Sequence, residues 1–293
     1  MAMQSVPVGL RADFEMCARL TASHYENFSV VSLFVPRGLR PHFCSIYAFC
    51  RGVDDLGDEL EGDRLAALDA YEEELRRAYG GTPQTPVFRA LQHTIEVCGL
   101  PIEPFLRLIE ANRRDQRQAT YETWDDLRDY CRYSADPVGR LVLGVFGCCD
   151  EERATLSDYT CTALQVANHL QDIHRDLQNG RIYLPKADLE SFGASLEDIR
   201  AARMTDGVRA CIKYEVERTA DWFRQGARLE ALVPRRLAMQ LRLYRLGGEA
   251  VLAALHRQNY DPFVRRPVIT SGQKLHIAMR TLIGVGQRGV APG

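Results

Sequence analysis

The sequence predicts an all-α protein. Apolar residues recur every three to four positions along most of the 293 residues, which is the spacing that lines one face of an α-helix. The alternation of apolar and polar residues that is typical of β-strands is essentially absent. No Gly/Ser-rich linker separates the helical stretches, so we expect a single domain over residues 1–293.

Prolines and glycines mark the expected ends of the helices. Pro137 should interrupt or kink a helix that begins near Trp124, because proline has no backbone N–H. Gly180 should end the long helix that begins after Asp150, since glycine readily adopts a left-handed conformation. The other expected helices cover residues 11–26, 63–79, 86–98, 102–119, 205–230 and 234–257, together with one that starts at Pro41 and one after Pro267.

Composition narrows the class of protein. The apolar content of 46% is enough for a sizeable core, and a net charge of −2 gives no indication of nucleic-acid binding. Nine cysteines without a CxxC pair indicate reduced thiols in a cytoplasmic protein, and because no charged n-region with an apolar stretch opens the sequence, we expect no signal peptide. The longest apolar run, Leu141 to Cys149, is far shorter than the roughly 20 residues that span a bilayer. We therefore expect at most peripheral contact, with the inner membrane.

The stretch from Gln165 to Pro185 carries the first candidate site. On a helical period Asn168, Asp172 and Asp176 share one face, with Gln165 one turn earlier. Like charges four positions apart destabilise a helix by roughly 0.2–0.5 kcal/mol. A bound cation is the simplest compensation for this cost.

A similar ladder of acidic side chains, which comes first along the chain, lies in the stretch from Tyr47 to Glu59. Asp54 and Asp58 share a helical face, which Arg51 and Tyr47 continue backwards. Two such ladders facing one another across a cleft would hold Mg²⁺, which takes oxygen ligands and bridges to phosphates. For either ladder alone, a solvated acidic helix face is the competing interpretation.

Three stretches together resemble squalene and phytoene synthases. Residues 47–59 resemble the first aspartate-rich motif of that family, and residues 165–185 resemble the second, including its terminal Gly-Arg-x-Tyr-Leu-Pro. Between them, residues 130–139 resemble a further family segment, Tyr-Cys-x-x-Val-Ala-Gly-x-Val-Gly. The resemblance extends from about His24 to Arg266. It implies the isoprenoid synthase fold, a single helical domain around a central cavity.

The ladders and the resemblance together give the candidate residues. The expected Mg²⁺ ligands are Asp54, Asp58, Asn168, Asp172 and Asp176. The catalytic candidates are Tyr47, Tyr130, Asp54 and Asp172. The candidates for binding the substrate diphosphate are Arg51, Gln165, Arg181, Tyr183 and Arg265. Two alternatives stay open here: Arg51 and Arg181 form surface salt bridges to neighbouring carboxylates, and Tyr130 is a core tyrosine.

The resemblance implies Mg²⁺-dependent ionisation of a farnesyl-derived prenyl diphosphate. Residues 24–28, residues 134–137 and the pair Gly247-Gly248 resemble the hopanoid-pathway branch of the family. That branch is similar to an enzyme that takes presqualene diphosphate to hydroxysqualene, so we expect no NADPH. Other enzymes of the squalene or hopanoid pathway are candidate partners.

Three other functions compete with this prediction. The first is a complete squalene or phytoene-type synthase that joins two prenyl diphosphates head to head. The second is a head-to-tail prenyltransferase, but Asp172-Ile-His-Arg-Asp176 lacks the paired aspartate of that class. The third is a non-catalytic assembly protein, which the intact aspartates disfavour. A GxGxxG match at residues 284–289 lacks the preceding strand of a dinucleotide site.

Overall fold

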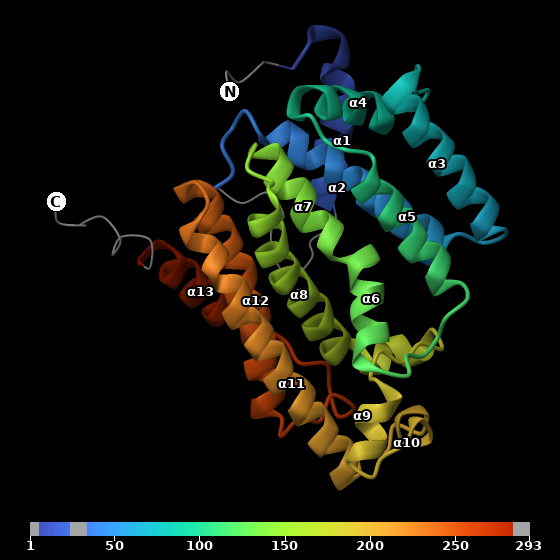
Figure 1. The fold of residues 1–293 in the computed structure, drawn as a ribbon, viewed down its shortest axis with the longest axis vertical. Coiled ribbons are helices and arrows are strands. Elements are labelled where there is room, and N and C mark those ends of the chain that lie inside the picture. Colours follow the sequence, from blue (N-terminus) through green and yellow to red (C-terminus); the bar gives the residue numbers. More distant parts are fainter. Residues whose placement is uncertain (1–5, 24–33, 284–293) are drawn as a thin grey trace. The chain divides into compact units, whose positions relative to one another are not determined.

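The structure is a computed structural model that describes residues 6–23 and 34–283 (Figure 1). Within those two ranges it contains helices and loops and no β-strand, which confirms the all-α prediction. The branch-specific stretch at residues 24–28 and the GxGxxG match at residues 284–289 lie outside the described residues.

The α-helices follow the predicted order closely. They are α1 (Arg11–Ser23), α2 (Arg40–Asp54), α3 (Arg64–Gly80), α4 (Pro86–Cys98), α5 (Glu103–Asp115), α6 (Trp124–Ser134), α7 (Asp136–Val145), α8 (Glu151–Gln178), α9 (Lys186–Ser191), α10 (Leu196–Arg200), α11 (Asp206–Gly226), α12 (Arg235–Arg257) and α13 (Ser271–Ile283). Three short segments complete the list: η1 (Val8–Leu10), η2 (Asp55–Glu59) and η3 (Ala227–Ala231).

The predicted helix breaks are confirmed. Helix α6 ends at Ser134 and α7 begins at Asp136, so Pro137 lies in the first turn of a new helix, where its missing N–H costs nothing. Helix α8 ends two residues before Gly180, whose φ of +72° is the left-handed conformation that favours glycine.

The chain divides into two compact units, each described here by itself. The first comprises residues 1–117 and 136–154, and the second comprises residues 118–135 and 155–293. The chain passes from one unit to the other inside α8, between Ala154 and Thr155. A single domain over residues 1–293 stays a prediction.

Helix α2 is the centre of the first unit. It packs against α1, α4, α5 and α7 (Figure 1). Its apolar residues recur at helical spacing, and the ring of Phe49 lies edge-on to Phe88 and Phe105 at centroid distances of 5.9 and 5.0 Å. Asp54, the last residue of α2, and Asp58, in the following segment η2, are exposed to solvent.

Close helix contacts organise the second unit, in which α12 packs against α11 and α13. A Cβ atom at Gly226 would lie 2.1 Å from the Thr160 hydroxyl, and one at Gly248 would lie 2.3 Å from the Phe223 ring. Both distances exclude a side chain. The glycine at position 248, part of the pair that resembled the hopanoid branch, is therefore required by helix packing here.

Candidate active site

The first acidic ladder is not the regular α-helix that the sequence analysis assumed. Helix α2 ends at Asp54, and residues Asp55–Glu59 form a π-helix in which Leu60 N donates to Asp55 O at 3.0 Å. The wider π turn changes the angle between successive side chains, so the 3.6-residue period does not hold across Asp58. π-Helical turns are frequent at functional sites.

Helix α5 and Gln116, the residue directly after it, hold this π-helix in place. Asn112 Nδ2 donates to Asp54 Oδ1 at 3.4 Å, and Gln116 Nε2 donates to the carbonyl of Gly57 at 3.0 Å. A Cβ atom at Gly57 would lie only 2.0 Å from Asn112 Oδ1. Glycine is therefore needed at position 57 for α5 to approach the first motif this closely.

Arg51 forms ion pairs with two carboxylates of the first motif. Its Nη2 lies 2.5 Å from Asp55 Oδ1 and 2.6 Å from Glu59 Oε1. Partial burial by itself would lower the pKa of Arg51, but the two carboxylates outweigh burial and raise it. A diphosphate would have to compete with these carboxylates for the guanidinium. Tyr47 lies one turn earlier on α2 and is partly buried.

The second ladder lies on α8 in the second unit. Asn168 is exposed, Asp176 is partly buried, and Asp172 is buried with 8% of its surface accessible. The two ladders thus lie in different units, and the expectation that they face each other across a cleft stays a prediction.

Asp172 is paired with an arginine that the sequence analysis did not select. Arg266 donates through Nε and Nη2 to the two carboxylate oxygens of Asp172, the second bond measuring 2.9 Å. The side chain of Gln171 donates to Pro267 O at 2.5 Å. These contacts fasten the segment between α12 and α13 onto α8. The pair joins residues 94 positions apart, and no local pattern marks it.

Arg265, the residue that the sequence analysis selected, points to a different partner. Its Nε donates to the side-chain oxygen of Gln258 at 3.1 Å, in the amide orientation that satisfies both groups. The described contacts therefore bring Arg266, and not Arg265, onto the second motif.

An aromatic cluster adjoins the second motif. The ring of His169 stacks on Tyr183 with a centroid distance of 3.6 Å and an interplanar angle of 14°. Tyr130 lies 5.7 Å from Tyr183 and 6.3 Å from His169, and Tyr121 lies 5.5 Å from Tyr130. Tyr130 is 5% exposed, so it is a buried member of this cluster, and its catalytic role stays a prediction.

His169 links this cluster to the acidic ladder. Its Nε2 lies 3.1 Å from Gln165 Nε2, and its Nδ1 lies 3.7 Å from Asp176 Oδ2. Two predicted residues, Gln165 and Asp176, are thus brought together through a histidine that sequence reasoning missed. The only local signal for His169 is its place between Asn168 and Leu170 on α8.

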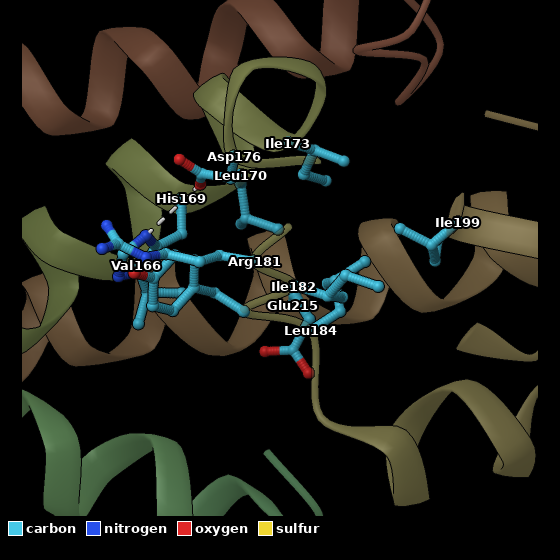
Figure 2. Close-up of a pocket in the computed structure, with 11 residues that line it drawn as sticks. Val166, His169, Leu170, Ile173, Asp176, Arg181, Ile182, Leu184, Ile199 and Glu215 are labelled. Carbon is cyan, nitrogen blue, oxygen red and sulfur yellow. Dashed lines mark ion pairs between the residues drawn. The ribbon is translucent and has the colours of Figure 1, made fainter. Parts of the chain in front are cut away.

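A pocket opens beside these groups in the second unit (Figure 2). It encloses about 340 Å³ of empty space, including its mouth. Predicted residues Asp176, Arg181 and Tyr183 line it, so the structure brings part of the second motif to one cavity. The other lining residues are Val166, His169, Leu170, Ile173, Ile182, Leu184, Ile199 and Glu215.

Glu215 is a buried carboxyl in the wall of this pocket. Burial raises its pKa to about 8, although Arg218 opposes the shift, and a hydrogen bond with Asp188 favours the protonated form. Arg218 spans both carboxyls, at 3.2 Å from Glu215 Oε1 and 2.9 Å from Asp188 Oδ2. The sequence does hold a signal for Glu215, which falls on the buried stripe of α11 formed by Val208, Cys211, Ile212, Val216 and Thr219.

The donor atoms of the second motif suit a hard divalent cation. Carboxylate and amide oxygens are the ligands that Mg²⁺ prefers. Asp176 Oδ2 is buried and accepts no hydrogen bond from the described residues, which leaves it able to bind a cation. Residues 6–23 and 34–283 contain no group of three His, Cys, Asp or Glu side chains close enough to enclose a metal ion. Mg²⁺ that keeps its waters and bridges to phosphates needs fewer protein ligands than that.

Comparison with known proteins agrees with these motifs. The squalene/phytoene synthase family model matches residues 21–273. The chain is 34% identical to hydroxysqualene synthase of Zymomonas mobilis over 272 residues, which are 88% of each chain. It is 32% identical to 15-cis-phytoene synthase of Synechococcus elongatus, over 89% of this chain and 90% of that protein.

Solved structures agree as well. Squalene synthase HpnC from Alicyclobacillus acidocaldarius matches with a TM-score of 0.86 and 76% identity, over 89% of this chain and 100% of that chain. A dehydrosqualene synthase in complex with ligand matches with a TM-score of 0.87, over 95% of this chain and 98% of that one. At 23% identity the second structure supports the fold alone.

The predicted fold and the predicted class of protein are therefore both confirmed. With both aspartate-rich motifs present and these matches along most of its length, the chain belongs to the squalene/phytoene synthase family, a family of prenyl diphosphate-processing enzymes with the isoprenoid synthase fold.

Proposed function

We propose that this enzyme converts presqualene diphosphate to hydroxysqualene with Mg²⁺ and without NADPH. The observation that carries the proposal is the 34% identity to a hydroxysqualene synthase over 88% of both chains. The residues that resemble the hopanoid branch support the same assignment. In this reaction water, and not hydride, captures the carbocation that remains after the diphosphate leaves.

The five acidic and amide candidates would hold Mg²⁺: Asp54, Asp58, Asn168, Asp172 and Asp176. Bound Mg²⁺ supplies Lewis-acid stabilisation of the departing diphosphate. The exposed carboxylates of Asp54 and Asp58 and the hydrogen-bond-free oxygen of Asp176 suit this role.

The diphosphate would draw the arginines away from their present partners. Guanidinium groups form two parallel hydrogen bonds with phosphate as well as with carboxylate. Arg51 would leave Asp55 and Glu59, and Arg266 would leave Asp172, so that substrate binding frees carboxylates as it binds arginines. Arg181 and Tyr183 already line the pocket beside Asp176, and Gln165 reaches it through His169; Arg265 stays a predicted contact.

The enzyme must also shield the carbocation from bulk water until one water molecule adds at the correct carbon. Aromatic faces stabilise positive charge, which fits a role for the buried Tyr130 and its neighbour Tyr183 near the reacting carbons. Tyr47 is the corresponding catalytic candidate on the first motif. The apolar residues that line the pocket exclude bulk water, which would otherwise quench the cation at the wrong carbon.

A second candidate function has its own support. The structure that is 76% identical to this chain is described as a squalene synthase, which favours a complete head-to-head synthase acting on two farnesyl diphosphates. The two candidates differ in their substrate and in their need for a reductant.

Product analysis separates the candidates. Purified enzyme is incubated with Mg²⁺ and either farnesyl or presqualene diphosphate, with and without NADPH, and the lipids are identified by mass spectrometry. We expect hydroxysqualene from presqualene diphosphate in both conditions. Squalene formed from farnesyl diphosphate only with NADPH would favour the second candidate.

Two variants test the proposed metal ligands in the same experiment. Asp54→Asn and Asp172→Asn should each lower turnover by at least 100-fold, because each removes a proposed metal ligand. Circular dichroism should show that both variants keep the helical fold, with a lower melting temperature only for Asp172→Asn, because this change also weakens the ion pair with Arg266. Full turnover in either variant, or in excess chelator, would refute the metal mechanism.

We further propose that the enzyme works in the cytoplasm, where reduced cysteines are typical, and that neighbouring enzymes of the same pathway are its partners.

A further inference from the structure

Helix α13 has an apolar face that is turned to solvent. Leu275, Met279 and Leu282 are 62%, 47% and 54% exposed, and their spacing of four and three residues places them on one side of the helix. Val264 and Val268, just before α13, are 78% and 56% exposed. These five account for half of the ten exposed large apolar side chains among the described residues, so exposed apolar residues are concentrated between positions 264 and 282.

The opposite face of α13 already has its packing partner. Ile277 and Thr281 are 5% and 0% exposed, and α13 packs against α12 (Figure 1). At 100° per residue, Ile277 lies about 165° and Thr281 about 125° from the centre of the stripe of Leu275, Met279 and Leu282. Helix α13 therefore has a buried side, which packs against α12, and a second, apolar side that is exposed to solvent.

The charged side chains of α13 and of the segment just before it are all basic. Lys274 lies on one flank of the stripe and Arg280 on the other, and both are exposed. No Asp or Glu occurs between Pro262 and Ile283, whereas Arg265 and Arg266 also fall in this stretch. A helix with an apolar stripe between basic flanks is typical of helices that lie in the plane of an anionic membrane surface.

None of the helices in the described residues is both long enough and apolar enough to cross a bilayer. We propose that α13 docks this enzyme on the surface of an anionic lipid bilayer, with Leu275, Met279 and Leu282 in the interface and Lys274 and Arg280 against lipid phosphates. If the proposed function holds, the product is a long isoprenoid alcohol that dissolves in lipid and not in water. The enzyme would then release it where it is soluble.

Vesicle flotation of the full-length enzyme without substrate tests the proposal, and its result does not depend on the proposed function. Vesicles of phosphatidylcholine alone are compared with vesicles that also contain phosphatidylglycerol. We expect binding to the anionic vesicles that is weakened by salt. Replacing Leu275, Met279 and Leu282 together by Ser should weaken it at least tenfold, because three exposed apolar side chains no longer enter the interface.

Two further variants complete the design. Val8→Ser, Met16→Ser and Leu232→Ser together remove three other exposed apolar side chains and should leave binding unchanged. Lys274→Glu with Arg280→Glu keeps the apolar stripe and should abolish the preference for anionic vesicles. All replaced side chains are exposed, so melting temperatures should stay close to that of the unmodified enzyme.

The proposal is overturned if the unmodified enzyme does not bind anionic vesicles, or if the stripe variant binds them as well as the control variant does. It is also overturned if the enzyme forms a dimer that the stripe variant dissociates while no vesicle binding occurs. In that case the stripe is an interface between two copies of the chain.

Discussion

The Asp172–Arg266 pair bears directly on the proposed binding of a metal ion by the second motif. Arg266 donates to both carboxylate oxygens of Asp172, and 8% of the Asp172 surface remains accessible. An oxygen that already accepts a charge-assisted hydrogen bond is a weaker ligand for a cation. Metal binding at Asp172 should therefore be weak until a diphosphate attracts Arg266.

We predict that Arg266→Gln strengthens Mn²⁺ binding in the absence of diphosphate. Loss of the pair frees the Asp172 carboxylate, and a charge-assisted hydrogen bond contributes about 1.5–3 kcal/mol when buried, less at this partly exposed arginine. The dissociation constant for Mn²⁺, measured by electron paramagnetic resonance, should fall by about three- to tenfold.

Arg265→Gln is the matched control for this prediction. It removes the same charge at the neighbouring position but leaves the Asp172 pair intact. An equal gain in Mn²⁺ affinity in both variants would mean that only net charge matters, and no gain in Arg266→Gln would mean that the pair does not restrict the metal.

Glu215 gives the stability of the enzyme a specific pH dependence. Burial, opposed by Arg218, raises its pKa from 4.5 to about 8. Below pH 4.5 the carboxyl is protonated in both folded and unfolded chains. Between pH 4.5 and 8 only the unfolded chain releases the proton, so the stabilising effect of the neutral form is lost as the pH rises through the folded pKa.

We therefore predict that Glu215→Gln loses this part of the pH dependence. The free energy of unfolding of the unmodified enzyme, relative to that of the variant, should fall between pH 5 and 8.5 by a few kcal/mol, at about 1.4 kcal/mol per pKa unit. Urea unfolding at both pH values measures it. Glu217→Gln, on the exposed side of the same helix, is the control and should keep the pH dependence of the unmodified enzyme. If Glu215→Gln also kept that pH dependence, the carboxyl of Glu215 would be ionised in the folded enzyme.

At the scale of the element, the π-helix of residues 55–59 depends on a glycine. We predict that Gly57→Ala destabilises the enzyme by about 1–3 kcal/mol, the usual cost of overpacking, because its methyl group would meet Asn112 at 2.0 Å. Turnover should fall as well, since Asn112 also holds Asp54. Urea unfolding and steady-state kinetics measure the two effects.

Gly80→Ala is the control for this change, since no atom lies within 4 Å of its added Cβ. If Gly57→Ala were as stable and as active as Gly80→Ala, the contact between α5 and the first motif would not matter. Adding Asn112→Ala to Gly57→Ala should restore part of the lost stability but not the turnover.

The helices also show which parts of the fold could be predicted from sequence patterns. Pro137 and Gly180 act through their own backbone, so the helix breaks beside them were predictable. The π-helix was missed because it is held by Asn112 on α5 and by Gln116 just after α5, and not by the local sequence. Helices α9 and α10, of six and five residues, are too short for a periodic pattern to reveal.

The same division applies to the candidate site. The acidic ladders were visible because four-residue spacing on a helix fixes which carboxylates share a face. Arg266 was missed because its pairing depends on the path of a loop that returns to α8. Glu215 was missed although its position within the apolar stripe of α11 marks it as buried.

At the scale of the whole molecule, each of the two units carries one of the two aspartate-rich motifs that are typical of the family. The first unit carries Asp54 and Asp58, and the second carries Asn168, Asp172 and Asp176. Both motifs are present in one chain that matches family members along about nine-tenths of its length. In the proposed reaction both motifs act while the diphosphate leaves, and water then captures the carbocation.

Turnover of presqualene diphosphate in ¹⁸O-labelled water, with and without NADPH, tests that capture step most directly. Mass spectrometry of the lipid product reports where the quenching group comes from. The account predicts hydroxysqualene with one ¹⁸O atom, formed at the same rate in both conditions. Unlabelled squalene that forms only when NADPH is present would contradict it.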